Sequence, residues 1–178
     1  IAALPEPLVG ELLEGELFVS PRPASLHTLA GSNLGGQLNP FGQRTPPGGR
    51  GGWWILDEPE LHLGRNVVVP DLAAWRKERM PEYPDAPFFT LAPDWVCEIA
   101  SPSTSRVDRL KKLPLYGREG VAHAWIVDPP LRTLEILRWH DGHWVIVSTH
   151  GDDERVRAEP FEALELELAG LWPPPPQG

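Results

Sequence analysis

Cysteine and long apolar runs are almost absent from this sequence of 178 residues. The single cysteine, Cys97, has no second cysteine with which to form a disulfide inside the chain, and this favours a reducing, cytoplasmic setting. A membrane-spanning helix needs roughly 20 consecutive apolar residues, and no stretch of the sequence approaches that length. We therefore expect a globular protein that has no membrane partner.

Positive charge is scarce as well. The chain has 16 lysines and arginines against 25 aspartates and glutamates, which gives a formal net charge of −9. A broad electrostatic surface for nucleic acid or anionic lipid is therefore not expected. Only three of the basic residues are lysines, and two of these, Lys111 and Lys112, are adjacent. An ammonium group approaches a phosphate or a water molecule more closely than a guanidinium does, which indicates a chemical role for this pair.

Proline and glycine, in contrast, are abundant, with 22 and 17 residues. Both residue types end regular structure, so the sequence predicts a chain with many loops and firm element boundaries. The length predicts one domain with its own core, over residues 1–172. Residues 173–178 begin with four prolines and are expected to form an extended tail.

The clearest local pattern is a strand, a helix and a second strand between Trp95 and Pro129. Residues 95–100 form an apolar run typical of a buried strand. Residues 105–119 follow a turn rich in serine and threonine and end before Gly120, as helices commonly do. Residues 124–127 form a second apolar strand. A unit of this kind predicts two neighbouring parallel strands.

Turn residues divide the rest of the chain into shorter elements. We predict a hairpin at residues 10–19 that turns at Glu14-Gly15, and another at residues 132–150 that turns at Asp141-Gly142. Trp139 and Trp144 flank the second turn, where we expect them to cover a sheet edge or form a dimer contact. The other predicted elements are a helix at 25–38, a loop at 40–52, a long strand at 53–63 bent at Pro59, a strand at 67–75 and a loop at 76–93.

Two of the predicted apolar strands each contain one carboxylate, Asp71 in residues 67–75 and Glu98 in residues 95–100. If these strands pair antiparallel, the two carboxylates can lie side by side. Close carboxylates repel one another unless they share a proton or a cation. A hard divalent cation such as Mg²⁺ satisfies such a pair, together with waters and a substrate phosphate. The alternative is that each acid lies at a strand end in water.

Several short motifs of the sequence resemble the PD-(D/E)XK nuclease superfamily and, within it, the Uma-type restriction endonuclease family. The similarity extends from about Gly10 to Trp139. The matching motifs are Glu14-Gly15-Glu16-Leu17 with Ser20-Pro21 and His27; Val69-Pro70-Asp71-Leu72; Glu98-Ile99-Ala100-Ser101-Pro102-Ser103-Thr104; Asp108 with Lys112 and Tyr116; and Gly120-Val121 through Trp125-Ile126-Val127-Asp128-Pro129. The resemblance implies an α/β fold, a mixed α+β sheet flanked by helices, in which a restriction endonuclease-like core carries the N-terminal hairpin and the C-terminal β-hairpin.

The resemblance also implies a phosphodiesterase site that uses Mg²⁺ or Mn²⁺. Asp71 and Glu98 would be the metal ligands. Glu16 and His27 match family positions and would lie near the same pocket, Glu16 as an outer metal ligand and His27 as a contact to phosphate or an aid to proton transfer. From the residues alone, Glu16 is a solvated strand end and His27 a surface histidine.

The sequence departs from the superfamily at the lysine that normally follows the acid on the same strand, because Ala100 occupies that position. In the Uma-type family the lysine is on the following helix, and Lys112 matches that place. An ammonium that reaches the same space from a helix would provide the same electrostatic stabilisation. Lys111 stays as an alternative. A second alternative is that Lys112 only pairs with Asp108, four residues earlier, on a solvated helix face.

We therefore expect a metal-dependent endonuclease that hydrolyses DNA phosphodiester bonds, and a homodimer, because duplex cleavage needs two sites. DNA would bind weakly and locally, at a small cationic rim formed by Arg22, His27, Arg44, Arg50, Arg106 and Arg109. The acidic net charge supports one alternative, a non-catalytic binding or assembly module that retains the fold. A third possibility is a hydrolase of another phosphoester, since a pair of acids does not by itself determine the substrate.

Overall fold

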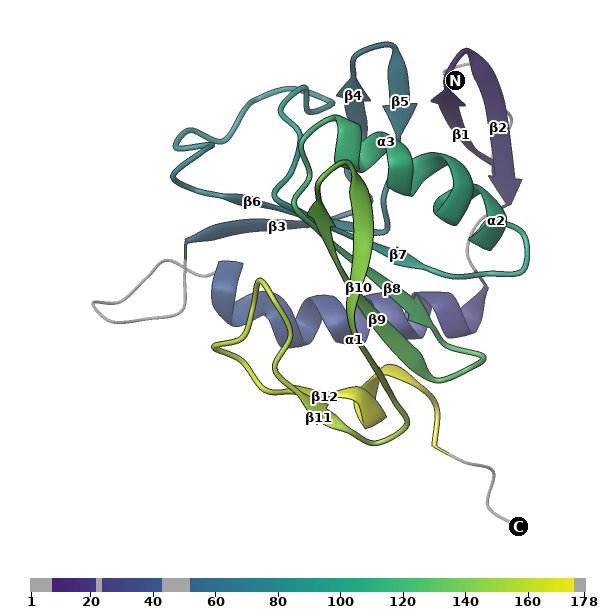
Figure 1. Cartoon of the computed structure of the whole chain (residues 1–178), viewed down its shortest axis with the longest axis vertical. Coiled ribbons are helices and arrows are strands. Elements are labelled where there is room, and N and C mark those ends of the chain that lie inside the picture. The colour runs from purple at the N-terminus through teal and green to yellow at the C-terminus, as the bar shows by residue number, and fades with distance from the viewer. Residues whose placement is uncertain (1–7, 22–23, 43–51, 175–178) are drawn as a thin grey trace.

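The computed structural model describes residues 8–21, 24–42 and 52–174, and Figure 1 shows how their elements are arranged. The rim arginines Arg22, Arg44 and Arg50 lie outside these ranges. A large mixed sheet forms the centre. Helix α1 (Ser25–Gly42) crosses one face of this sheet. A second helical segment, residues 105–118, lies over the other face together with a smaller sheet.

The large sheet has the strand order β10-β9-β8-β7-β6-β3. Its central strands β7 and β8 run parallel, with Glu98 opposite Ile126, and the other neighbours are antiparallel. The parallel pair confirms the predicted strand–helix–strand unit. The strands are β3 (Trp53–Asp57), β6 (Leu72–Arg76), β7 (Trp95–Ile99), β8 (His123–Asp128), β9 (Thr133–His140) and β10 (His143–Gly151).

The smaller sheet is antiparallel and has the order β2-β1-β5-β4. It contains the predicted N-terminal hairpin, which turns at Glu14-Gly15, both with positive φ. Its strands are β1 (Leu8–Leu13), β2 (Glu16–Pro21), β4 (Leu61–Leu63) and β5 (Asn66–Val68). A short pair, β11 (Arg155–Val156) and β12 (Leu166–Glu167), and a 3₁₀ turn at Leu168–Leu171 follow near the C-terminus.

Two of the predicted long strands are wrong, because each is divided between the two sheets. Residues 53–63 form β3 and then β4, with a break at Glu58-Pro59 where Glu58 has φ +46°. Residues 67–75 form β5 and then β6, with a break at Val69-Pro70-Asp71. Proline has no N–H for a sheet ladder, so each proline marks the point where the chain changes sheets. Asp71 therefore lies directly before β6 and not inside a strand.

Helix α1 is longer than predicted and includes Pro40 in its last turn. The predicted loop at 40–52 therefore begins too early. The reason is packing, because Phe41 is buried and its ring centroid lies 4.9 Å from that of Phe161. This contact keeps the chain helical beyond a proline that removes a helix hydrogen bond.

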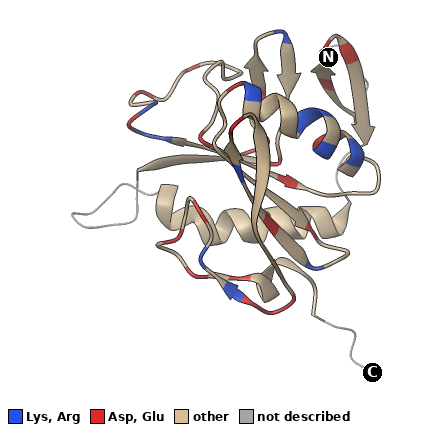
Figure 2. Ribbon diagram, in the orientation of Figure 1, with Lys and Arg blue, Asp and Glu red and all other residues tan. Residues whose placement is uncertain are grey.

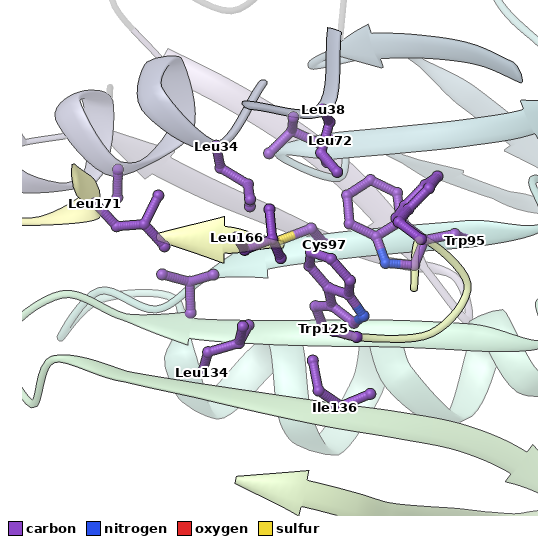
Figure 3. Packing of buried hydrophobic residues seen from close by; sticks show 14 of the residues in the cluster. Leu34, Leu38, Leu72, Trp95, Cys97, Trp125, Leu134, Ile136, Leu166 and Leu171 are labelled. Carbon is purple, nitrogen blue, oxygen red and sulfur yellow. The ribbon is translucent and has the colours of Figure 1, made fainter. Parts of the chain in front are cut away.

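The two faces of the large sheet have separate cores, which the alternation of side chains along β7 illustrates. Trp95, Cys97 and Ile99 point to the face covered by α1 and the C-terminal segment, and Figure 3 shows Cys97 packed among the labelled side chains of this core. Val96 and Ala100 belong to the core of the opposite face. Glu98, between them in the alternation, therefore points to that opposite face.

The C-terminal hairpin confirms the predicted turn, since Asp141 and Gly142 both have positive φ between β9 and β10. Trp139 and Trp144 stand opposite one another in this hairpin, with ring centroids 5.3 Å apart. They pack on the helical segment: Trp144 Nε1 donates to the carbonyl of Leu113 at 2.7 Å. Within the described ranges, no helix is long and apolar enough to cross a membrane.

Candidate active site

A cavity of about 250 Å³ lies where the two sheets, the start of α1 and the second helical segment meet. The open end of the N-terminal hairpin forms one wall, and β7 with the turn after it forms another. Charged side chains are concentrated here, and those that line the cavity are Glu11, His27, Glu58, Asp71, Glu98, Asp108 and Lys112.

Asp71 and Glu98 are brought together by the antiparallel pairing of β6 and β7, in which Leu72 lies opposite Cys97. This is the arrangement that the two lone acids predict. Asp71 Oδ2 accepts the backbone N–H of Ile99 at 2.6 Å, and its Oδ1 lies 3.0 Å from His27 Nε2. The side chain of Asp71 is 18% exposed and that of Glu98 only 3%. In this pair, the Asp71 carboxylate is therefore partly exposed to solvent and the Glu98 carboxylate is buried.

Glu98 is held by two donors from the helical segment. Lys112 Nζ lies 2.9 Å from both carboxylate oxygens, and Tyr116 Oη donates to Oε1 at 2.6 Å. Burial raises the pKa of Glu98 well above its ordinary value, and the charge of Lys112 opposes this rise. Tyr116 is buried as well. Its burial and the negative charge of Glu98 raise the pKa of the Tyr116 hydroxyl well above 10, so this hydroxyl keeps its proton.

Lys112 reaches into the cavity and has further partners there. Its ammonium lies 3.0 Å from Glu11 Oε1, 3.2 Å from the carbonyl of Val69 and 3.7 Å from Asp108 Oδ1. Burial alone would lower its pKa, but Glu98 and the other carboxylates raise it, so Lys112 stays a cation. Lys111 points away: its side chain is 38% exposed and lies 3.5 Å from Glu14. The structure thus brings Lys112 into the site and leaves Lys111 outside.

The helical segment reaches this position through an irregular turn. It consists of α2 (Ser105–Val107), a π-helical turn (Asp108–Lys112) and α3 (Leu113–Arg118). The N–H of Leu113 donates to the carbonyl of Asp108, five residues back. Pro114, which has no N–H, follows at once. The wider turn buries both Asp108 and Lys112, which overturns the alternative of an ion pair on a solvated helix face.

His27 also joins the site, through the contact with Asp71. Burial lowers the pKa of His27, but the hydrogen bond and the charge of Asp71 more than offset this effect, so the net pKa lies above 6.5. Asp71 therefore favours the charged form of the His27 imidazole. His27 lies between this cavity and a smaller one of about 200 Å³ that Asp57, Glu58 and Ser32 also line.

Glu16 is the predicted site residue that the structure does not bring to the cavity. It is exposed at the turn end of the hairpin, opposite Leu13, whereas Val9, Glu11, Ser20 and Pro21 line the cavity from the open end. Glu11 takes part instead and also accepts the N–H of Val69 at 2.8 Å. Its place two residues before the buried Leu13, on the same face of β1, is the sequence signal that Glu11 faces inward.

The donors fit a hard divalent cation. Five carboxylates line the cavity against one lysine and one histidine, so a cation would balance an excess of negative charge. Carboxylate oxygens are the ligands that Mg²⁺ and Mn²⁺ prefer. Among the residues that the structure describes, no three or more His, Cys, Asp or Glu side chains form a ready cluster of metal ligands. Asp71 and Glu98 therefore fit a metal that would be completed by waters and substrate, as is common for Mg²⁺.

A mixed sheet with Glu98 on β7, Asp71 directly before the neighbouring strand β6 and a lysine supplied by the following helical segment is typical of a restriction endonuclease-like fold. Comparison with protein families agrees: the model of the Uma2 family, described as "Putative restriction endonuclease", matches residues 4–169. The chain belongs to the Uma2 family.

Solved structures agree on the fold. One of them, described as a putative nuclease belonging to DUF820 from Anabaena variabilis, superposes with a TM-score of 0.76 over 96% of this chain and 93% of its own. The two sequences are 24% identical, so this similarity concerns the fold alone. The comparison with curated proteins found no significant match.

Proposed function

We propose that this protein is a divalent-metal-dependent endonuclease that hydrolyses DNA phosphodiester bonds. The observation that carries the proposal is the meeting of Asp71, Glu98 and the charged ammonium of Lys112 at one cavity. Family membership supports a nuclease-like activity. The metal, the DNA substrate and the residue roles are our inference from the cavity.

Asp71 and Glu98 would hold Mg²⁺ or Mn²⁺. When bound, the metal supplies charge neutralisation at the scissile phosphate and an activated water. Lys112 provides a permanent positive charge beside these ligands, where it can orient the attacking water or stabilise charge that develops on the phosphate. His27 holds Asp71 through the 3.0 Å contact and keeps one of its oxygens fixed. We assign no role to Glu16, because it does not line the cavity.

The helical segment also supports DNA as the substrate. Residues 105–118 contain five basic residues, Arg106, Arg109, Lys111, Lys112 and Arg118, and a single acid, Asp108. Figure 2 shows this concentration of basic residues along the helical segment from α2 to α3. Basic residues therefore outnumber the acid five to one in this segment, which borders the cavity, although Arg109 pairs with Glu135 and both Lys111 and Arg118 pair with Glu14. Two copies acting together would cut both strands of a duplex, so a homodimer remains part of the proposal.

Cleavage of supercoiled plasmid tests the proposal. The wild-type protein should nick plasmid with Mg²⁺ or Mn²⁺ and lose activity in EDTA. Asp71→Asn and Glu98→Gln should each reduce the rate at least about 100-fold, because each removes charge at the metal. Glu16→Gln is the matched control, since it makes the same chemical change at an exposed position, and it should retain activity. A Glu98→Gln variant as active as the wild type would contradict the proposal.

One observation favours a second candidate, a non-catalytic module. Glu98 already has its charge balanced by Lys112 and a hydrogen bond from Tyr116, so the fold satisfies this acid without a metal. Titration with Mn²⁺ separates the two functions, because a purely structural ion cluster has no reason to bind the metal. Heat of binding that disappears in Asp71→Asn would support the nuclease, and its absence in the wild type would support the module.

A further inference from the structure

We propose that Tyr116 is a positioning residue that fixes the orientation of the Glu98 carboxylate for metal binding. The inference rests on the proposed metal role of Glu98. It assigns a separate task to the hydroxyl group of Tyr116, which does not line the cavity and would not touch the metal or the substrate.

The contacts place Tyr116 behind Glu98 as seen from the cavity. Tyr116 lies on α3 and is fully buried, at 0% exposure. Its hydroxyl donates to Glu98 Oε1 at 2.6 Å, a short hydrogen bond to a carboxylate. Glu98 itself lines the cavity. The hydroxyl therefore holds one oxygen from the protein side while the carboxylate faces the space that a metal would occupy.

Lys112 cannot perform this task alone. Its ammonium lies 2.9 Å from both Glu98 oxygens and also contacts Glu11 at 3.0 Å, so it is shared among several acceptors. A carboxylate bound only to a shared point charge is free to rotate about its last torsion, which is broad in glutamate. A second donor in a fixed position removes that freedom. The Tyr116 ring provides the fixed position because it is packed in the core beneath the site.

The core packing of Tyr116 belongs to its ring and not to its hydroxyl. Tyr116→Phe keeps the ring, so it should leave the fold in place and remove only the hydrogen bond. Partners that orient metal ligands typically contribute about 10–100-fold to metal affinity. A residue that served packing alone would show no such effect.

The test compares Tyr116→Phe with Tyr83→Phe, the same chemical change at the other tyrosine of the chain, which is 49% exposed and does not line the cavity. Mn²⁺ affinity is measured by isothermal titration, and thermal unfolding is followed without metal. We expect Tyr116→Phe to bind Mn²⁺ about 10–100-fold more weakly while it still unfolds cooperatively. Tyr83→Phe should bind like the wild type.

Three outcomes decide the inference. A Tyr116→Phe protein that is folded and binds Mn²⁺ with wild-type affinity, while Glu98→Gln does not bind, overturns the role of Tyr116 and leaves the proposed function intact. A wild-type protein that binds no Mn²⁺ overturns the metal site and the role of Tyr116 with it. Weakened binding in Tyr116→Phe alone, with Tyr83→Phe unchanged, supports the inference.

Discussion

Lys112 connects carboxylates from three separate segments of the chain. Glu11 belongs to β1, Glu98 to β7 and Asp108 to the π-helical turn, and all three lie within 3.7 Å of the ammonium. The cation is 4% exposed, so water screens these contacts little. Because the acids outnumber the base, at least one of them is costly to ionise.

Asp108 is the acid on which this cost can be measured. Burial raises its pKa from 3.8 to about 6, although Lys112 and the Thr104 hydroxyl oppose the rise. Between these values the folded chain keeps a proton that the unfolded chain has released, so stability falls as the pH rises. Asp108→Asn removes the ionisation and should raise the free energy of unfolding at pH 8 by roughly 1–3 kcal/mol.

Urea unfolding at pH 8 and near pH 4 measures this effect. The gain from Asp108→Asn should shrink near pH 4, where the folded wild type has protonated Asp108. Asp85→Asn, at an exposed position in the loop before β7, is the control and should change little at either pH. An Asp108→Asn variant less stable than the wild type at pH 8 would show that the Lys112 contact outweighs the burial.

At the residue level, a site residue can be predicted from the sequence when its type is unusual for the segment in which it lies. Asp71 and Glu98 are lone acids in apolar runs. Lys112 is one of only three lysines, and Ala100 occupies the position where the superfamily normally has its lysine. The structure brings all three together. Glu11 is not predictable in the same way, because its partner Lys112 lies about a hundred residues away and the pattern of β1 shows only that Glu11 faces inward.

At the scale of elements, the C-terminal hairpin holds the helical segment in place. Trp139 lies against Gly117, and Trp144 donates to the carbonyl of Leu113. These contacts fix α3 at both ends of the stretch that carries Tyr116. The hairpin therefore supports the site without contributing a residue to it.

Gly117→Ala should break this support. A Cβ built on Gly117 would lie 2.3 Å from Trp139 Cε3, and the Trp139 ring is held against Trp144. Overpacking of this kind costs about 1–3 kcal/mol, so the melting temperature should fall by several degrees. Gly36→Ala on α1 is the control, because a Cβ there has open space and alanine favours a helix. Equal melting temperatures for the two variants would contradict the role of the hairpin.

The helices and strands could be predicted from the sequence where the apolar pattern was continuous. They could not be predicted where the chain passes from one sheet to the other at a proline. The strand–helix–strand unit and both hairpins follow from apolar runs and turn residues. The division at Pro59 and Pro70 does not, because an extended chain reads the same whether it bends within one sheet or passes to a second. The π-helical turn was equally hidden, since Pro114 indicates an irregularity without showing its form.

At the scale of the whole molecule, the net charge of −9 conceals an uneven distribution. The helical segment is cationic, and the exposed Arg106 lies on it near the cavity. DNA contacts should therefore be few. If three or four phosphates are neutralised, the logarithm of the affinity should fall with the logarithm of salt concentration with a slope of about −3.

Fluorescence anisotropy of a labelled duplex with Ca²⁺, across a salt series, measures this slope. Arg106→Glu should weaken binding. Arg157→Glu, the same charge change on the C-terminal segment, should not. Binding should also require the metal, because Asp71 and Glu98 without a cation repel phosphate. No detectable binding at low salt, for duplex and single strand alike, would favour the non-catalytic module.

The residues of the cavity and the C-terminal hairpin that supports them are far apart in the sequence, so they leave the ribosome at different times. The ribosome releases Glu11, Asp71 and Glu98 before Lys112 and Tyr116, and the hairpin with Trp139 and Trp144 comes later still. A nascent chain that stops short of the helical segment holds the acids without their cation. We therefore expect the site to be completed late, after the hairpin has emerged, so that a half-made chain lacks the complete site.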